Sequence, residues 1–375
     1  MRICHFSSTS LEGAYFRHLS HGFAADGHTY HCGTLAGHPP PRWVAEDPPA
    51  SYFALGTTDR RGWPAAAVRL ARYLRRHRID VLQTHLVHGA LVGTMAAKLA
   101  RIPLLVHMRH HIDDVRLTGR DVHVAVDRAL AAAADEVVVP SHAAKRYLST
   151  VEGIDPTHIT VIHLGFDLDT IGGEDGDRER VRAELGLGED VTLGCIARMS
   201  PNKGHSFLFE AVRDLALEFP DVRLMLVGEG DPQPYREAAR AAGIEGRTLF
   251  LGQRADVPAC LRAMDVVVLP SLSESFSQVI IEALAAGRPL VATDVGGARE
   301  VIADADNALL VPARDSAALR DAIRRVLTDD DLRAGLAERG RPSVARFSVA
   351  GMVREHLELY ERSPGRRRKP SRALR

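Results

Sequence analysis

Short apolar runs alternate along the chain with longer segments in which apolar residues recur at helical spacing. Runs with the length and composition of buried strands occupy residues 2–6, 29–32, 81–85, 103–108, 136–140 and 159–163. Helical patterns fill the segments between them, at residues 15–25, 63–77, 89–100, 121–134 and 142–149. Because regular strand–helix alternation favours a parallel sheet covered by helices, this part of the chain is predicted to form a doubly wound α/β lobe.

The alternation breaks at residues 172–177, a stretch of glycine and acidic residues typical of an exposed connector. A second alternation of the same kind follows it. We therefore predict a fold class of two Rossmann-like α/β lobes, over residues 1–170 and 171–345, with a cleft between them. The basic, proline-containing segment 363–375 is predicted to be a disordered tail.

Charge and cysteine content indicate which partners and which cellular compartment to expect for the protein. The chain has 48 basic and 48 acidic residues, so no global field draws it to nucleic acid, and no nucleic-acid partner is expected. Its four cysteines lie far apart without a CxxC pair, which favours reduced, buried thiols. The chain starts in a strand pattern without a signal-peptide pattern, and no apolar run is long enough to span a membrane. A cytoplasmic protein is expected.

Two basic segments allow an association with the inner face of a membrane. They are the tail and the helical segment 63–77, whose arginines include Arg72, Arg75 and Arg76. A solvated surface is the more common reason for such charges, and peripheral binding to acidic lipids is the alternative hypothesis.

The segment 276–286 is predicted to be a buried helix, because it is apolar on nearly every side. Glu282 is its one charged residue. A carboxylate in such a helix is costly unless it is paired, so we expect a partner: the ribose hydroxyls of a nucleotide, or a structural arginine.

Glu274 precedes this predicted helix by a short loop. Backbone amides of Phe276, Ser277 and Gln278 at the helix start would present partial positive charge, which suits a diphosphate oxygen. Glu274 would then lie beside the sugar attached to that diphosphate. The loop therefore predicts a nucleotide-sugar site.

Another loop with candidate ligands follows the apolar run 191–197. It carries Arg198 and Lys203, and ligands of open α/β sheets bind at the carboxyl ends of strands. The two cations are interpreted as a diphosphate clamp. Gly228, in a later strand–helix loop with a second glycine, is either a donor-binding position or a tight turn of the lobe.

Histidines follow the predicted strand 103–108 in the first lobe. His110 and His111 come directly after its carboxyl end, where they are placed to meet a reacting sugar. A metal site formed with Asp113 is disfavoured, because adjacent side chains seldom converge on one ion. No metal is expected.

The residues of the second lobe together resemble the signature of the retaining, GT-B-fold glycosyltransferase family 4. The resemblance rests on the stretch from Ser271 to Pro289, in which Glu274 and Glu282 are separated by seven residues, supported by Arg198 with Lys203. The motifs Gly228-Glu-Gly230, 291–300 and 307–312 follow in the family's order and cover most of the lobe.

The resemblance implies a role for each of these residues. Arg198 and Lys203 would neutralise the leaving diphosphate, Glu274 would contact the donor sugar, and Glu282 would hold the ribose. His110 aligns with a family histidine, with His107 and His111 as alternatives. The final helix, at about residues 346–362, would pack back on the first lobe.

The first lobe departs from the family pattern at the loop where acceptors are expected. The usual glycine pair is replaced by Gly13 and Ala14. The implied function is retaining transfer of a sugar from a nucleoside-diphosphate sugar to a hydroxyl of a glycan, lipid-linked or small-molecule acceptor, in polysaccharide, lipid-linked glycan or glycoconjugate biosynthesis. No cofactor or metal is expected beyond the donor itself. A sugar-nucleotide epimerase and a non-catalytic nucleotide-sugar-binding protein are the alternatives.

Overall fold

The computed structural model describes residues 1–46, 50–110 and 121–362, and these form two compact units. The first unit contains residues 1–165 together with the described residues from Phe347, and the second contains residues 166–346. The divisions fall a few residues from those predicted at 170/171 and 345/346. The predicted tail, 363–375, lies outside the described residues.

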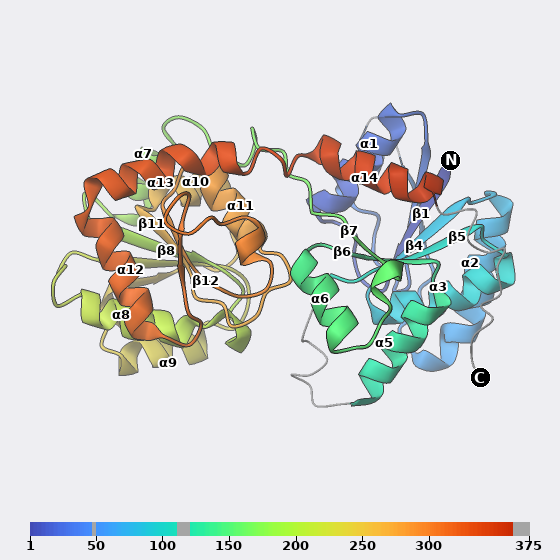
Figure 1. The fold of residues 1–375 in the computed structure, drawn as a ribbon, viewed down its shortest axis with the longest axis horizontal. Coiled ribbons are helices and arrows are strands. Elements are labelled where there is room, and N and C mark those ends of the chain that lie inside the picture. Colours follow the sequence, from blue (N-terminus) through green and yellow to red (C-terminus); the bar gives the residue numbers. More distant parts are fainter. Residues whose placement is uncertain (47–49, 111–120, 363–375) are drawn as a thin grey trace. The chain divides into compact units, whose positions relative to one another are not determined.

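The first unit contains a seven-stranded sheet in the order β3-β2-β1-β4-β5-β6-β7, in which all paired strands are parallel (Figure 1). The strands are β1 Arg2–Ser7, β2 Thr29–Thr34, β3 Ser51–Ala54, β4 Val81–His85, β5 Leu104–Met108, β6 Glu136–Val139 and β7 Ile159–Val161. Parallel strands need crossover connections, and the helical segments supply them. Those helices are α1 Ala14–Ala25, α2 Trp63–Arg76, α3 Val87–Ala100, α5 Asp121–Ala133 and α6 His142–Thr150.

The last helix of the chain belongs to the first unit. Helix α14, Val349–Arg362, lies beside α1, as Figure 1 shows. Its buried face includes Met352, Val353, His356 and Tyr360, with Tyr360 fully buried. The first unit is therefore completed by a segment far from it in sequence.

The second unit contains a six-stranded parallel sheet in the order β10-β9-β8-β11-β12-β13. The strands are β8 Thr192–Ile196, β9 Arg223–Val227, β10 Thr248–Phe250, β11 Val266–Leu269, β12 Leu290–Thr293 and β13 Leu309–Val311. The covering helices are α7 Asp177–Leu185, α8 His205–Leu215, α9 Gln233–Ala241, α10 Val257–Ala263, α11 Gln278–Ala285, α12 Ser316–Thr328 and α13 Asp330–Ser343. Leucine and valine side chains of the central strands form its core.

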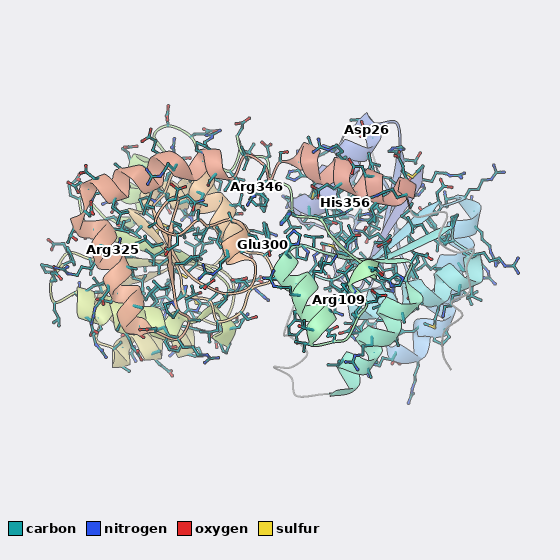
Figure 2. The ribbon with its side chains drawn as sticks, viewed as in Figure 1. Asp26, Arg109, Glu300, Arg325, Arg346 and His356 are labelled. Atoms are coloured by element: carbon teal, nitrogen blue, oxygen red, sulfur yellow. The ribbon has the colours of Figure 1, made fainter. Side chains whose placement is uncertain are left out.

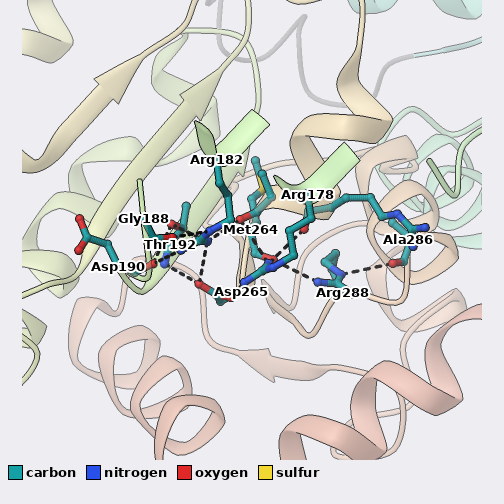
Figure 3. Close-up of polar contacts among 11 residues, drawn as sticks. Arg178, Arg182, Gly188, Asp190, Thr192, Met264, Asp265, Ala286 and Arg288 are labelled. Carbon is teal, nitrogen blue, oxygen red and sulfur yellow. Dashed lines mark hydrogen bonds and ion pairs between the residues drawn. The ribbon is translucent and has the colours of Figure 1, made fainter. Parts of the chain in front are cut away.

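An arginine network ties helix α7 to the amino ends of β8 and β11 (Figure 3). Asp265 accepts hydrogen bonds from Arg178 at 2.7 Å and from the Thr192 amide at 2.8 Å. Arg182, which is buried, donates to the carbonyls of Gly188 and Asp190. Because these contacts lie at the amino ends of the strands, they stabilise the sheet and leave its carboxyl edge to other residues.

Candidate functional site

The order of the strands in the second unit reverses between β8 and β11, so the connections leaving these two strands diverge. Such a switch point is where open α/β sheets bind ligands, beyond the carboxyl ends of the strands. The loop after β8 carries Arg198 and Lys203, and the loop after β11 carries Glu274. The structure therefore places these three predicted residues at one edge of one sheet.

Two glycines allow the loops at this edge to pack closely. Gly204 has φ +68°, and a Cβ there would lie 2.0 Å from the Pro270 carbonyl oxygen. Gly228 has φ +155°, and a Cβ there would lie 2.0 Å from the Ala197 carbonyl oxygen. Only glycine fits either position. Packing against the β8 loop thus accounts for Gly228, and its predicted contact with a donor stays a prediction.

Lys203 and Glu274 form an ion pair in this structure, with Nζ 2.7 Å from Oε1. Their side chains are only 16% exposed. The Ser271 hydroxyl, which is buried, donates to the same Oε1 at 2.7 Å. Both hydrogen bonds end on one oxygen, so the carboxylate is held in place while Oε2 keeps its lone pairs for another donor.

Arg198 differs from Lys203 in having no internal partner. Its side chain is exposed, and within residues 166–346, all of which are described, it forms no ion pair or hydrogen bond. A guanidinium at a switch point, unsatisfied by the protein, is suited to bidentate binding of a phosphate oxygen pair.

The helix after Glu274 begins later than predicted. Helix α11 starts at Gln278, and Ser277 has extended backbone angles, so Phe276 and Ser277 precede the helix. Phe276 is 7% exposed, and the extended backbone of Ser277 separates it from the first helical residue. The prediction that residues 276 and 277 are helical is wrong, while Gln278 is exposed at the first turn, where backbone amides lack intrahelical partners.

Glu282 lies in the second turn of α11 and is largely buried. Burial raises the pKa of its carboxyl group to about 6. Within the second unit its side chain has no hydrogen bond or ion pair, so the structural arginine considered from the sequence does not occur there. A desolvated carboxylate that is still partly exposed and has no donor in this unit fits the hydroxyls of a ligand.

His110 lies just beyond the carboxyl end of β5 in the first unit. Its Nε2 is 2.9 Å from Nδ1 of His85, at the end of the neighbouring strand β4. His107 instead points into the unit, with both ring nitrogens bonded to the hydroxyls of Thr84 and Thr94. His107 is therefore a structural residue. His111 and Asp113 lie outside the described residues.

The predicted acceptor residues mark the start of α1. Gly13 is the N-cap residue and Ala14 the first helical residue, and both are exposed. A Cβ at Gly13 would meet nothing within 4 Å, and its φ of −62° suits any residue. The site therefore has no steric need for glycine here, and a role in acceptor binding stays a prediction.

Several polar residues of the first unit were missed from the sequence. His5 and His85 are buried in strands β1 and β4, and the ring nitrogens Nδ1 of His5 and Nε2 of His85 lie 3.3 Å apart. Tyr360 of α14 contacts His5. The available signal was a histidine inside a run otherwise suited to a buried strand, which occurs in both β1 and β4.

The fold and the site define a ligand-binding α/β enzyme with polar residues gathered at the carboxyl edges of two parallel sheets. Family models match both parts of the chain: glycosyltransferase family 4 over residues 13–170 and glycosyl transferases group 1 over residues 190–329. The chain belongs to this glycosyltransferase family and is a glycosyltransferase.

Individual relatives and solved structures agree with that membership. The chain is 30% identical over 309 residues to D-inositol 3-phosphate glycosyltransferase of Corynebacterium glutamicum, covering 77% of this chain and 74% of the relative. It is 30% identical over 302 residues to phosphatidyl-myo-inositol mannosyltransferase of Mycobacterium leprae, covering 80% and 77%. The structure of Anabaena HepE in complex with UDP and glucose matches with a TM-score of 0.84 and 25% identity, over 96% of this chain and 99% of that one.

These similarities also decide between the functions considered from the sequence. The relatives are transferases by name, and both family models describe transferases. They do not favour the epimerase or the non-catalytic binding protein. The two-lobe GT-B fold class is confirmed.

Proposed function

We propose that the enzyme transfers a sugar from a nucleoside-diphosphate sugar to an acceptor hydroxyl with retention, and that the second unit binds the donor. The arrangement of Lys203, Glu274 and Ser271 at the β8/β11 switch point carries this proposal. It offers a cation for a phosphate and a fixed carboxylate for a sugar hydroxyl within one cluster. The complex of the HepE relative with UDP and glucose makes a UDP-sugar the first donor to test.

Each part of the donor has a candidate partner in the second unit. Arg198, Lys203 and the amides at the start of α11 would neutralise the diphosphate, and Glu282 would accept hydrogen bonds from ribose hydroxyls. Hydrogen bonds from two ribose hydroxyls would offset part of the free-energy cost of desolvating the Glu282 carboxylate. Ribose binding therefore explains why a carboxylate without a partner in this unit occupies this position.

Electrostatic stabilisation of the leaving group would be the main catalytic effect. The bond between the anomeric carbon and the phosphate oxygen breaks, and negative charge collects on the departing diphosphate. Fixed cations and amides aimed at that charge contribute about 2–4 kcal/mol each to lowering the barrier. The acceptor oxygen would bond to the anomeric carbon while the departing phosphate oxygen accepts the acceptor's proton. The protein's own cations would replace a metal ion.

The acceptor belongs to polysaccharide, lipid-linked glycan or related glycoconjugate biosynthesis in this proposal. Two of the relatives carry inositol phosphate or phosphatidyl-myo-inositol in their names, so these compounds are the first acceptors to test. A glycan or another small polyol would be tested next.

Donor binding and turnover test the proposal together. Thermal stability would be followed with UDP-, GDP- and ADP-sugars, alongside release of the nucleoside diphosphate and the anomeric configuration of any product. We expect one nucleotide to stabilise the protein, the Arg198→Ala/Glu282→Ala variant to lose that effect, and EDTA to leave turnover unchanged. Arg325→Ala is the matched control, since Arg325 is exposed on α12 of the same unit (Figure 2). No stabilisation by any nucleotide would overturn the proposal.

We also propose that the enzyme works in the cytoplasm at the inner face of a membrane, bound through its first unit. Helices α2 and α3 pack against each other (Figure 1). Their outer side carries Val68, Met95 and Leu99, which are 40%, 38% and 47% exposed. Exposed large apolar side chains are rare elsewhere in the described residues.

The apolar side chains of this α2–α3 surface lie among cations. Exposed basic residues on the two helices and directly after α3 are Arg69, Arg72, Arg75, Arg76, Lys98 and Arg101. In the described part of the chain none of them forms an ion pair with a carboxylate. Basic and apolar residues on one surface fit an anionic lipid interface. Within the described residues, no helix has the length and apolar character to cross a bilayer.

Sedimentation with lipid vesicles tests the surface. Vesicles containing phosphatidylglycerol should bind the protein, and pure phosphatidylcholine vesicles should not. Arg72→Glu/Arg76→Glu should weaken binding at least tenfold at low salt, because each basic residue near an anionic surface contributes about 1 kcal/mol. Arg325→Glu in the second unit should bind as the wild type does. Equal binding of both variants would contradict a specific role of α2 and α3.

A further inference from the structure

The loop that carries Glu274 is held by the two loops next to it in the second unit. Strand β11 lies between β8 and β12 in the sheet (Figure 1). The loop after β8 contacts the Glu274 loop through Lys203 and through the Asn202 carbonyl, which accepts from the Leu272 amide at 2.8 Å. The loop after β12 contacts it from the other strand. The proposed donor contacts involve no residue of this third loop.

Thr293, the last residue of β12, joins the two loops by a buried hydrogen bond. Its hydroxyl donates to the Ser271 carbonyl at 2.5 Å, while the Leu269 carbonyl lies farther away, at 3.3 Å. Because a hydroxyl has one proton, the shorter contact takes it. Ser271 in turn donates its own hydroxyl to the Glu274 carboxylate. Thr293 therefore fixes the backbone of the residue that orients Glu274.

Gly296 makes a second contact, against the backbone of Glu274 itself. It has φ +54°, and a Cβ there would lie 1.6 Å from the Glu274 carbonyl oxygen. This distance is far inside van der Waals contact, so any other residue at this position would push the Glu274 backbone away. The absence of a side chain at Gly296 thus decides how closely the loop after β12 packs on Glu274.

A small cavity beside these contacts leaves the Glu274 loop without complete packing. Ser271, Glu274, Ser277, Thr293 and Val295 are among the residues that line it. Because an empty space offers no van der Waals contacts to its lining, packing alone does not fix the loop here. The hydrogen bond from Thr293 and the close contact of Gly296 supply the restraint that packing leaves out.

We propose that Thr293 and Gly296 are positioning residues, which hold Glu274 where it contacts the donor sugar. They act through the backbone of the Glu274 loop, so their effect falls on the sugar. The nucleotide contacts proposed for Arg198 and Glu282 stay in place. The role in sugar binding rests on the proposed function, in which Glu274 contacts the donor sugar, whereas the restraint of the loop does not.

Hydrogen exchange of the full-length protein without any ligand tests the restraint of the loop. Thr293→Val keeps the shape of the side chain and removes its hydroxyl. Amide exchange in residues 270–277 should become at least fivefold faster, because the loop backbone loses a restraint. Thr293→Ser keeps the hydroxyl and should stay close to the wild type. Unchanged exchange in Thr293→Val would overturn the proposal.

A matched control lies on another strand of the same unit. Thr248, the first residue of β10, is also buried, and its hydroxyl donates to the Ile244 carbonyl at 2.8 Å. Thr248→Val removes an equivalent bond at the amino end of a strand, so exchange in residues 270–277 should not change. If both valine variants raise this exchange equally, the effect is a general loss of stability and Thr293 has no specific positioning role.

Comparing a nucleotide with its sugar derivative tests the role in donor binding. The probes are UDP and UDP-glucose, and the corresponding GDP and ADP pairs replace them if the wild type binds neither. In Thr293→Val the Kd of UDP-glucose should rise about tenfold, because a displaced carboxylate loses its hydrogen bonds to the sugar. The Kd of UDP should stay within about twofold. Thr293→Ser should behave as the wild type, and equal weakening of both probes in Thr293→Val would overturn the positioning role.

Gly296→Ala is a second variant, with a larger expected effect. It should weaken UDP-glucose at least thirtyfold and UDP no more than threefold, because its Cβ displaces the Glu274 backbone. Gly186→Ala is the matched control: Gly186 ends α7 with a similar φ of +64°, and a Cβ there would meet nothing within 4 Å. It should bind both probes as the wild type does, and equal behaviour of the two alanine variants would contradict the role of Gly296.

The two experiments separate the positioning role from the proposed function. If the wild type binds none of the nucleotides, the proposed function fails and the role in sugar binding fails with it. The exchange rates of Thr293→Val and Thr248→Val then still decide whether Thr293 restrains the Glu274 loop. If the wild type binds nucleotides and Thr293→Val treats UDP and UDP-glucose alike, the proposed function stands and only the positioning role is refuted.

Discussion

The two units place polar residues at the carboxyl ends of parallel strands in opposite ways. The first unit buries neutral rings, with His5 and His85 linked to one another and to helix α14. The second unit keeps charges, with the Lys203–Glu274 ion pair, the exposed Arg198 and the buried Glu282. The same sheet topology therefore supports one site suited to an uncharged hydroxyl and another suited to an anion.

The difference makes the stability of the two units depend on pH to different extents. A buried histidine whose pKa is lowered stabilises the fold above the unfolded value of about 6.5, and this stability is lost as the pH falls below it. A buried carboxyl whose pKa is raised favours the fold below the unfolded value of about 4.5, and this stability is lost as the pH rises towards the folded value. Histidines with a lowered pKa dominate in the first unit, and Glu282 of the second unit is a carboxyl group with a raised pKa.

Acidification should destabilise the first unit more than the second. The pKa values of His107 and His356 are both about 4 in the folded state. At pH 5 these two residues together remove about 4 kcal/mol of stability, and His5 and His85 add to the loss. In the second unit His205 has a similarly low pKa, but protonation of Glu282 offsets part of the loss.

Tryptophan fluorescence isolates this effect. Both tryptophans of the chain, Trp43 and Trp63, lie in the first unit. When the pH is lowered from 7.5 to 5, the urea midpoint of the fluorescence change, which reports the first unit, should fall. It should fall further than the urea midpoint of the part of the circular dichroism change that does not coincide with the fluorescence change, which reports the second unit. His107→Gln, which removes one titrating ring, should reduce the fall. Equal shifts of the two midpoints would contradict the proposed difference between the units.

Removing the exposed cation of the second unit should give the next largest effect. Arg198→Ala should lower kcat about a hundredfold or more, equivalent to about 3 kcal/mol, because it deletes a positive charge that the proposed function assigns to the leaving group. Folding stability should stay unchanged, since Arg198 has no partner within residues 166–346. Steady-state kinetics and thermal unfolding measure the two quantities. A loss of stability with unchanged kcat would make Arg198 a structural residue.

Much of this fold was predictable because both lobes follow a simple pattern. Apolar strands and amphipathic helices alternate regularly, and the strands of parallel sheets are buried on both faces. The start of α11 was not predictable in the same way. Phe276 continues the helical pattern in sequence, but Ser277 after it has an extended backbone, and the helix begins at Gln278.

The site was predictable where its chemistry is local in sequence. Arg198, Lys203 and Glu274 lie in loops after strands, and strand topology brings these loops to one edge. The contact between His5 and Tyr360 joins residues that are 355 positions apart. No local pattern identifies such partners, and only the packing of α14 against α1 brings them together.

Glu282 provides a smaller test with the opposite sign of pH dependence. Glu282→Gln should stabilise the protein by about 2 kcal/mol at pH 8, because the ionised carboxylate is unfavourable at this buried position. The gain should disappear below about pH 4.5, where the carboxyl is protonated in both folded and unfolded states. Urea unfolding at the two pH values measures it. The variant should also bind the nucleotide more weakly, and a gain independent of pH would contradict the raised pKa.

The smallest expected effect comes from the hydrogen bond that Ser271 donates to the Lys203–Glu274 ion pair. Ser271→Ala removes one hydrogen bond to Glu274 and should lower kcat/KM about fivefold, or about 1 kcal/mol, because Lys203 still fixes the carboxylate. Ser206→Ala is the matched control, since Ser206 is exposed in the first turn of α8. If Ser271 acts through Glu274, its effect should change in the background of Lys203→Ala, because residues sharing one partner couple. Strictly additive effects would show that Ser271 and Lys203 act independently. That result would contradict the view that both residues act by holding Glu274 in place.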